Sequence, residues 1–237
     1  MQKLWAEDLQ WDQPLPPQYL AKWHAYWESL SELDTLQIPR NVNPNNGVNQ
    51  IDLFGFGDAS QSALGACLYA VSVNEDNHTQ SHLVCAKSRV APLKTLSLPR
   101  LELEAVLLLA QLYRSVRGAL LGRIRRVYLW SDSTIVLGWI KTEPHALKTF
   151  VANRVAKIQE LTEEASWGHV PSEENPSDIL SRGTTIEFLK TNELWWKGPS
   201  WIKEDDSRPR YMRFRSSRNK DICYVSNHRF SCRNLGA

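Results

Sequence analysis

The chain has 237 residues, 42% of them hydrophobic, which is enough for the core of one sizeable domain with appendages. Its formal net charge of +2 excludes a uniformly acidic or strongly basic protein, and its four cysteines exclude a disulfide framework. It has neither a leader-like opening segment nor an apolar stretch of transmembrane length, so we expect a soluble, intracellular protein.

The first 49 residues predict a helical segment followed by a linker. Apolar residues recur at helical spacing over 18–33, directly after the proline-rich run that ends at Pro17. A stretch rich in Pro, Asn and Gly then covers 39–47, which is typical of a linker. The main domain is therefore expected over 50–185.

Three predicted strands open this domain, and helices alternate with strands after them. The strands are expected over 51–57, 63–73, 81–89, 125–131 and 166–170, and the helices over 98–118, 133–141, 146–164 and from about 176. Ser97 is the expected N-cap of the first of these helices, with Pro99 in its first turn. This order predicts an α/β fold with a mixed five-stranded sheet flanked by helices.

The four cysteines fall into two strand-like runs and the C-terminal tail. Cys67 and Cys85 lie in strand-like runs and are expected to be buried. The tail at 204–237 is basic and lacks periodicity, so we expect disorder there. In it, Cys223, His228 and Cys232 offer three metal ligands, and the missing fourth argues against a zinc site.

Positive charge is clustered along the chain. Nine Lys or Arg residues face only two acids between Lys87 and Arg126, and eight face one acid from Arg208 onward. This clustering suits a polyanion such as nucleic acid, although on charge alone a solvated basic surface is the favoured explanation.

Four acidic residues stand at the end or inside of apolar segments: Asp58, Glu102, Asp132 and Asp178. Clustered carboxylates in an apolar setting cannot all ionise without a cation to offset them. Four of them therefore indicate a hard divalent metal, and metal indicates phosphoryl transfer.

Local geometry supports a functional role more strongly for some of these acids than for others. On the helix over 98–118, Glu102 lies about 160° from Glu104, so Glu102 should be buried and Glu104 should face solvent. The alternative for Glu102 is an ion pair with Arg100 or with a lysine of a neighbouring strand. Asp58 and Asp132 both emerge at the carboxyl end of a strand, where open sheets place ligand sites.

Asp132 and Asp178 also have simpler explanations. Asp132 could be the N-cap of the following helix. Asp178 could be an ordinary first-turn acid that the helix dipole stabilises.

The runs around these acids resemble a type 1 ribonuclease H domain, and more narrowly the one in reverse transcriptase polyproteins of BEL/Pao-type LTR retrotransposons. The resemblance extends to about residue 203 and rests on Asp58-Ala-Ser, Arg100-Leu-Glu102-Leu, Trp130-Ser-Asp132-Ser, Asn175-Pro-Ser-Asp178 with Ser181-Arg182, Phe150-Val-Ala-Asn-Arg154 and Trp195-Trp-Lys-Gly-Pro199. It makes 1–49 a connection segment after a polymerase part, and 186–203 a family-like extension.

The resemblance implies an endonuclease that cleaves the RNA strand of RNA–DNA hybrids with two Mg²⁺ ions, for which Mn²⁺ can substitute. Asp58 would touch both ions, Glu102 and Asp132 one of them, and Asp178 the other. The implied partners are the hybrid and the polymerase part of the polyprotein. The implied places are the cytoplasm, a virus-like particle or the nucleus.

The chain departs from this family at one loop. Many members carry a mobile His before the last aspartate, whereas this loop reads Pro171-Ser-Glu-Glu-Asn175. The nearest histidine, His169, is expected in or beside a strand as a structural residue. Glu173 and Glu174 are the other candidates to assist, and the sequence does not choose between them.

Two other hypotheses compete with a nuclease. One is a catalytically idle nucleic-acid-binding remnant of the same fold, which the presence of all four acids disfavours. The other is an aspartic peptidase, a label used for Pao-type polyproteins. Peptidase chemistry needs two aspartates that share a proton, usually before a glycine, and neither Asp58 nor Asp132 has that glycine.

Overall fold

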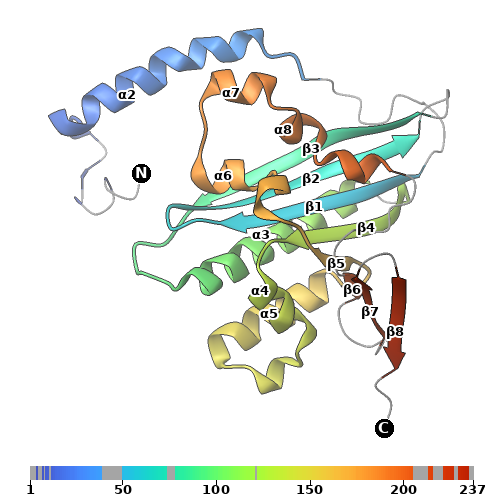
Figure 1. Ribbon diagram of the computed structural model, residues 1–237. Coiled ribbons are helices and arrows are strands. Elements are labelled where there is room, and N and C mark those ends of the chain that lie inside the picture. The colour runs from blue at the N-terminus through green and yellow to red at the C-terminus, as the bar shows by residue number, and fades with distance from the viewer. Residues whose placement is uncertain are drawn as a thin grey trace.

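A mixed β-sheet forms the centre of the molecule (Figure 1). The structure is a computed structural model, and it describes residues 4, 7, 9–10, 12–38, 50–73, 78–120, 122–204, 213–215, 221–226 and 229–234. Its first five strands are β1 (Ile51–Ala59), β2 (Ala63–Val73), β3 (Thr79–Val90), β4 (Ile124–Ser131) and β5 (Ser166–His169). They lie in the order β3-β2-β1-β4-β5 and confirm the predicted five-stranded mixed sheet.

The direction of the strands changes at β1. β2 runs antiparallel to both β1 and β3, as hairpin-connected strands do. β4 runs parallel to β1, because β3 has the direction of β1 and a helix connects β3 to β4. β5 runs parallel to β4, and helices also connect these two strands. As a result, the carboxyl ends of β1, β4 and β5 lie at the same edge of the sheet.

Helices cover both faces of this sheet (Figure 1). One face carries α3 (Leu98–Ala119), α4 (Thr134–Lys141) and α5 (Thr149–Leu161). The other carries α6 (Asp178–Arg182), α8 (Glu193–Lys197) and the 3-10 helix η4 (Ser200–Lys203). The remaining helical elements are α2 (Pro17–Ser29), α7 (Ile186–Thr191) and the 3-10 helices η1 (Leu30–Thr35), η2 (Pro144–Ala146) and η3 (Ser172–Glu174).

The alternation of side chains along β1 separates two apolar cores. Leu53 points toward α3, where Gly55 and Gly57 let the helix approach the strand closely, and a Cβ on Gly55 would stand 2.9 Å from Leu109. Phe54 and Phe56 point to the opposite face. There, Phe54 stacks 5.0 Å from Tyr128, its register partner on β4.

The segment 186–203 closes this second face. Trp195 and Ile202 are buried in it, and the Tyr69 hydroxyl donates a 2.7 Å hydrogen bond to the Trp195 carbonyl oxygen. The Trp201 ring meets that of Trp130 edge-on at 5.0 Å. The family-like extension therefore packs against the core of the domain.

One helix boundary and one helix cap differ from expectation. The helix expected over 146–164 begins only at Thr149, because Pro144–Ala146 forms a separate 3-10 turn that Leu147 leaves in an extended conformation. Ser97 occupies the N-cap position of α3 with Pro99 in its first turn, but the Ser97 side chain makes no capping hydrogen bond.

The tail contains strands where we expected disorder. β6 (Arg213–Arg215) pairs with β5, β7 (Asp221–Ser226) pairs with β6, and β8 (Arg229–Asn234) pairs with β7. Backbone pairing of this kind requires no apolar periodicity, which explains why the sequence did not indicate it. The other residues from 205 onward lie outside the described part of the chain, as does the expected linker at 39–47.

In the described residues, no helix is long and apolar enough to cross a membrane.

Candidate active site

Asp58 is the most deeply buried of the four predicted acids. It is the next-to-last residue of β1 on the face of Phe54 and Phe56, and only 7% of its surface is exposed. Burial raises the pKa of its carboxyl to about 6, against a hydrogen bond from Ser181 that lowers it. The negative charges of Asp132 and Asp178 raise it further, so both lie near enough to act on Asp58.

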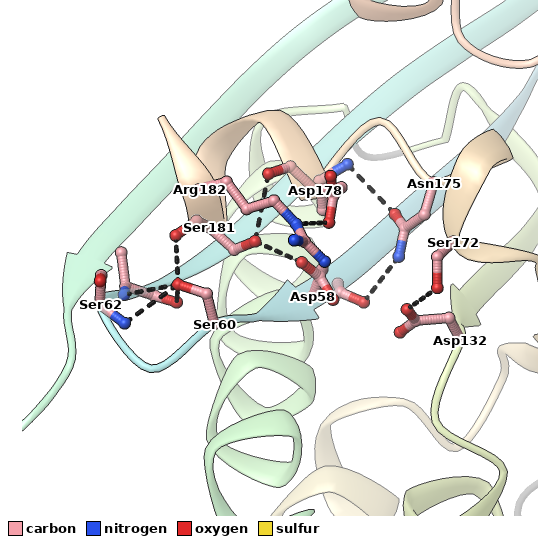
Figure 2. Close-up of polar contacts among 12 residues, drawn as sticks. Asp58, Ser60, Ser62, Asp132, Ser172, Asn175, Asp178, Ser181 and Arg182 are labelled. Atoms are coloured by element: carbon pink, nitrogen blue, oxygen red, sulfur yellow. Dashed lines mark hydrogen bonds and ion pairs between the residues drawn. The ribbon is translucent and has the colours of Figure 1, made fainter. Parts of the chain in front are cut away.

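Asp132 directly follows β4 and has one oxygen without a partner. Its Oδ2 accepts a 2.6 Å hydrogen bond from the Ser172 hydroxyl, whereas its buried Oδ1 has no hydrogen-bond partner (Figure 2). Asp132 is not the N-cap of α4. That position belongs to Ser133, whose Oγ accepts from the backbone N–H of Val136, so the simpler explanation of Asp132 is wrong.

Glu102 faces Asp132 from the first turns of α3. It is half-buried, and its Oε2 accepts a 2.5 Å hydrogen bond from the Ser133 hydroxyl. Burial raises the pKa of Glu102, and the charge of Asp132 adds to the effect. The alternative ion pair with Arg100 is not formed, and the Arg100 guanidinium instead lies 4.9 Å from the centre of the Phe150 ring.

Asp178 is the first residue of α6 and is held by a cation. Its Oδ1 accepts a 2.5 Å hydrogen bond from Arg182 Nε, one helical turn later. Two hydrogen bonds fix the loop before α6 to β1. The side-chain amide of Asn175 donates to the Gly57 carbonyl oxygen, and the hydroxyl of Ser177 donates to the Phe56 carbonyl oxygen. Figure 2 shows Asp58, Asp178 and Arg182 side by side, with Asp132 turned toward Ser172.

The four acids thus come from four separate parts of the chain to one edge of the sheet, and their joint role as a metal site stays a prediction. They are not drawn together into a finished metal centre: in the part of the chain that the structure describes, no three His, Cys, Asp or Glu side chains are grouped closely enough to hold an ion as they stand. Each acid instead accepts a hydrogen bond from a protein side chain.

The prediction for Glu104 is wrong. Its side chain is 20% exposed and forms a 2.5 Å ion pair with Arg154, whose guanidinium stacks on the Phe150 ring at 3.5 Å. The helical wheel identified a different face from that of Glu102, but α5 covers it, and a wheel cannot show a neighbouring helix.

The sequence did not predict the hydrogen bonds that hold the acids, which come from the side chains of Ser133, Ser172, Ser181 and Arg182. The signal that could have found Arg182 is its spacing of four residues from Asp178, at which helical side chains meet. The serines carry no comparable signal, because each hydrogen-bonds to an acid that is distant in the sequence.

The structure gives a specific contact to one of the three residues considered as assistants in catalysis. His169 ends β5, as expected for a structural residue. Glu174 accepts a 2.7 Å hydrogen bond from the Trp201 indole and so ties the loop to η4, while Glu173 is exposed. The zinc hypothesis stays untested, because His228 and the side chains of Cys223 and Cys232 lie outside the described part.

The strand order and the family comparison together define a ribonuclease H-like domain. A sequence model of the family described as "Pao retrotransposon-like RNaseH-like domain" matches residues 1–133. The chain belongs to this family. A search of the curated proteins finds no match.

Several solved structures are similar to this chain at low identity. Ribonuclease H1 from the archaeon Halobacterium salinarum NRC-1 is 16% identical, with a TM-score of 0.34, over 56% of this chain and 94% of that one. LC11-RNase H1 in complex with an RNA/DNA hybrid is 17% identical, with a TM-score of 0.38, over 59% and 99%. The foamy viral protease-reverse transcriptase in complex with dsDNA is 13% identical, with a TM-score of 0.38, over 62% and 94%.

Proposed function

We propose that this domain is a metal-dependent endonuclease that cleaves the RNA strand of RNA–DNA hybrids as part of a retrotransposon polyprotein. The observation that carries the proposal is the convergence of Asp58, Glu102, Asp132 and Asp178 on one edge of the sheet. Burying carboxylates that repel one another lowers the stability of the fold, and a purely structural role would not offset this loss.

The acids suit two Mg²⁺ ions, or Mn²⁺ in their place. Carboxylate oxygens are the ligands that these hard cations prefer, and the buried Asp132 Oδ1 lacks any other partner. We assign Asp58 to both ions, Glu102 and Asp132 to one, and Asp178 to the other. Bound there, the ions would activate the attacking water and offset charge on the leaving oxygen.

The hydroxyl groups of the site would orient the ligands. Ser133 and Ser172 fix one oxygen each of Glu102 and Asp132, which leaves the second oxygen of each carboxylate for a cation. Ser181 donates to Asp58 and is itself held through its carbonyl oxygen by the Ser60 hydroxyl at 2.5 Å. This support would keep Asp58 in place when its charge changes.

Basic side chains beside the acids would hold the nucleic acid. Lys87 and Arg89 are exposed at the end of β3, and Lys94 and Arg100 are exposed on the connection to α3 and in its first turn. Cations along this path would neutralise backbone phosphates and bring the scissile bond toward Glu102. The 2′-hydroxyls of the RNA strand would distinguish a hybrid from duplex DNA.

The test is cleavage of an end-labelled RNA–DNA hybrid with Mg²⁺ or Mn²⁺, with duplex DNA and single-stranded RNA as comparison substrates. We expect cuts only in the RNA of the hybrid, which leave 5′-phosphate and 3′-hydroxyl ends. Asp58→Asn and Glu102→Gln should each lower the rate by about a hundredfold or more, as removal of a stabilising group from an active site does.

Glu104→Gln is the matched control, because Glu104 lies two residues from Glu102 and binds Arg154 outside the site. It should retain the activity of the parent. Activity that survives both Asp58→Asn and Glu102→Gln would exclude the metal mechanism.

An idle hybrid-binding domain is the second candidate. It is favoured by the absence, among the described residues, of a preformed three-ligand cluster and by the pairing of Asp178 with Arg182. A parent protein that binds the hybrid but cuts nothing in either metal would identify it. A peptidase is disfavoured, because neither Asp58 nor Asp132 stands before the glycine that usually follows the paired aspartates of that chemistry.

A further inference from the structure

The four acids do not receive equivalent hydrogen-bond donors. Three accept from a neutral hydroxyl: Asp58 from Ser181, Glu102 from Ser133 and Asp132 from Ser172. Asp178 accepts from the guanidinium of Arg182 and forms an ion pair with it. A full positive charge is thus supplied to the cluster at one of its four carboxylates.

Arg182 acts on more of the cluster than the residue it touches. Its hydrogen bond with Asp178 and the charge of that residue raise the pKa of the guanidinium, and the charges of Asp58 and Asp132 raise it further. The Arg182 side chain is 68% exposed and that of Asp178 is 32% exposed, so this ion pair stands at the open side of the site. Figure 2 shows the guanidinium between Asp178 and Asp58.

We propose that Arg182 is an internal counter-ion: its guanidinium binds the carboxylate of Asp178 until a divalent cation displaces the guanidinium. This inference rests on the proposed function and adds an order of binding to it. An ion held by Glu102 and Asp132 meets only hydroxyls, which can rotate and donate elsewhere. An ion at Asp178 must first break a charge-assisted pair, so it binds more weakly and second.

The displaced guanidinium stays within reach of the site because α6 anchors it. Once Asp178 binds an ion, it no longer accepts from these N–H donors. The planar guanidinium, with its five N–H groups, then matches the oxygens of a phosphate. Arg182 would then pass from a carboxylate to the nucleic-acid backbone as the second ion enters. In this role it is a positioning residue, whose effect is on metal affinity.

The test measures metal binding without nucleic acid. Free Mn²⁺ is followed by electron paramagnetic resonance while it is titrated into the parent, Arg182→Gln and Arg182→Lys. The parent should bind two ions of unequal affinity. Arg182→Gln should strengthen the weaker site roughly fivefold, the upper range for an exposed ion pair, whereas Arg182→Lys should stay close to the parent.

The control is Lys197→Gln, which breaks another exposed pair of the same i, i+4 spacing, with Glu193 at 2.7 Å. It should change neither affinity. A second readout is the Arg182 Nε–H resonance in ¹⁵N spectra, assigned with Arg182→Lys. Under Mg²⁺ it should shift only at concentrations that fill the weaker site.

The outcomes separate this inference from the function beneath it. Two ions that bind the parent with the weaker affinity unchanged in Arg182→Gln overturn the counter-ion role and leave the nuclease proposal standing. A parent and an Arg182→Gln variant that both bind no Mn²⁺ at millimolar concentration overturn the metal site itself, and the counter-ion with it.

Discussion

A Cβ atom built on Gly65 would stand 2.5 Å from the Cβ of Leu180 and 2.8 Å from the carbonyl oxygen of Ser177. Strand β2 and helix α6 therefore touch with no room for a side chain between them. This contact sets the height of α6 above the sheet, and so the position of Asp178 relative to Asp58.

Gly65→Ala should destabilise the protein by about 1–3 kcal/mol, because the added methyl forces α6 outward. Urea unfolding measures this loss. Gly138→Ala is the matched control, since a Cβ at Gly138 of α4 meets nothing within 4 Å, and alanine should there stabilise the helix by about 0.5–1 kcal/mol. Equal stability of the two variants would contradict the tight packing of α6.

Asp58→Asn should stabilise the metal-free protein at neutral pH. The folded pKa of Asp58 is about 6, above its ordinary value of 3.8. Stability from this group is therefore full below about pH 4 and is lost as the pH rises through about 6. The variant should gain about 1–3 kcal/mol at pH 7 and nothing at pH 4.

The same substitution at Asp52 should have the opposite sign. Asp52 is buried on the same strand, but it accepts hydrogen bonds from Arg125 at 2.7 and 2.9 Å and from Arg126 at 3.1 Å. Asp52→Asn should lose about 1–2 kcal/mol at pH 7. The free energy of unfolding of both variants is measured at pH 4 and 7. A loss of stability in Asp58→Asn at pH 7 would show that burial of the Asp58 carboxylate does not destabilise the fold.

Trp201→Ala should cost about 2–4 kcal/mol, although it lies outside the domain limits expected from the sequence. Its ring contacts those of Phe56 and Trp130, and its indole N–H donates to Glu174. Trp27→Ala on α2, where the ring is 63% exposed, should change stability little. Similar small losses in both variants would show that η4 does not close the core.

Glu104 and Arg154 should show a coupling energy of about 1 kcal/mol in a double-mutant cycle of Glu104→Gln and Arg154→Gln. Their ion pair joins α3 to α5 and is less than one third exposed. Lys157 and Glu160, paired on the exposed surface of α5, serve as the reference and should couple by less than 0.5 kcal/mol. A coupling no larger than this reference would remove the ion pair as a link between the helices.

The sequence predicted the strands well because their apolar runs end at turn residues. It placed Asp58 and Asp132 at strand ends for the same reason, since side-chain alternation continues along β1 and β4. These inferences depend on local periodicity, and local periodicity is preserved in the folded chain.

What the sequence could not predict depends on contacts between distant segments. Glu104 was assigned to solvent because α5 is invisible on a helical wheel. The contact of Ser181 was not predicted either, because its hydroxyl donates to Asp58 across 123 positions of the chain. The packing of 186–203 against β1 and β4 was missed for the same reason, because Trp201 has no apolar periodicity around it.

The acids lie far apart along the chain, and this distance sets when the site can first exist. A growing polypeptide that has produced β1, α3 and β4 carries Asp58, Glu102 and Asp132, but not the helix that bears Asp178. The full set forms only after residue 182 has left the ribosome and α6 has docked over Gly65. The proposed site would therefore be completed late in translation, after the sheet has formed.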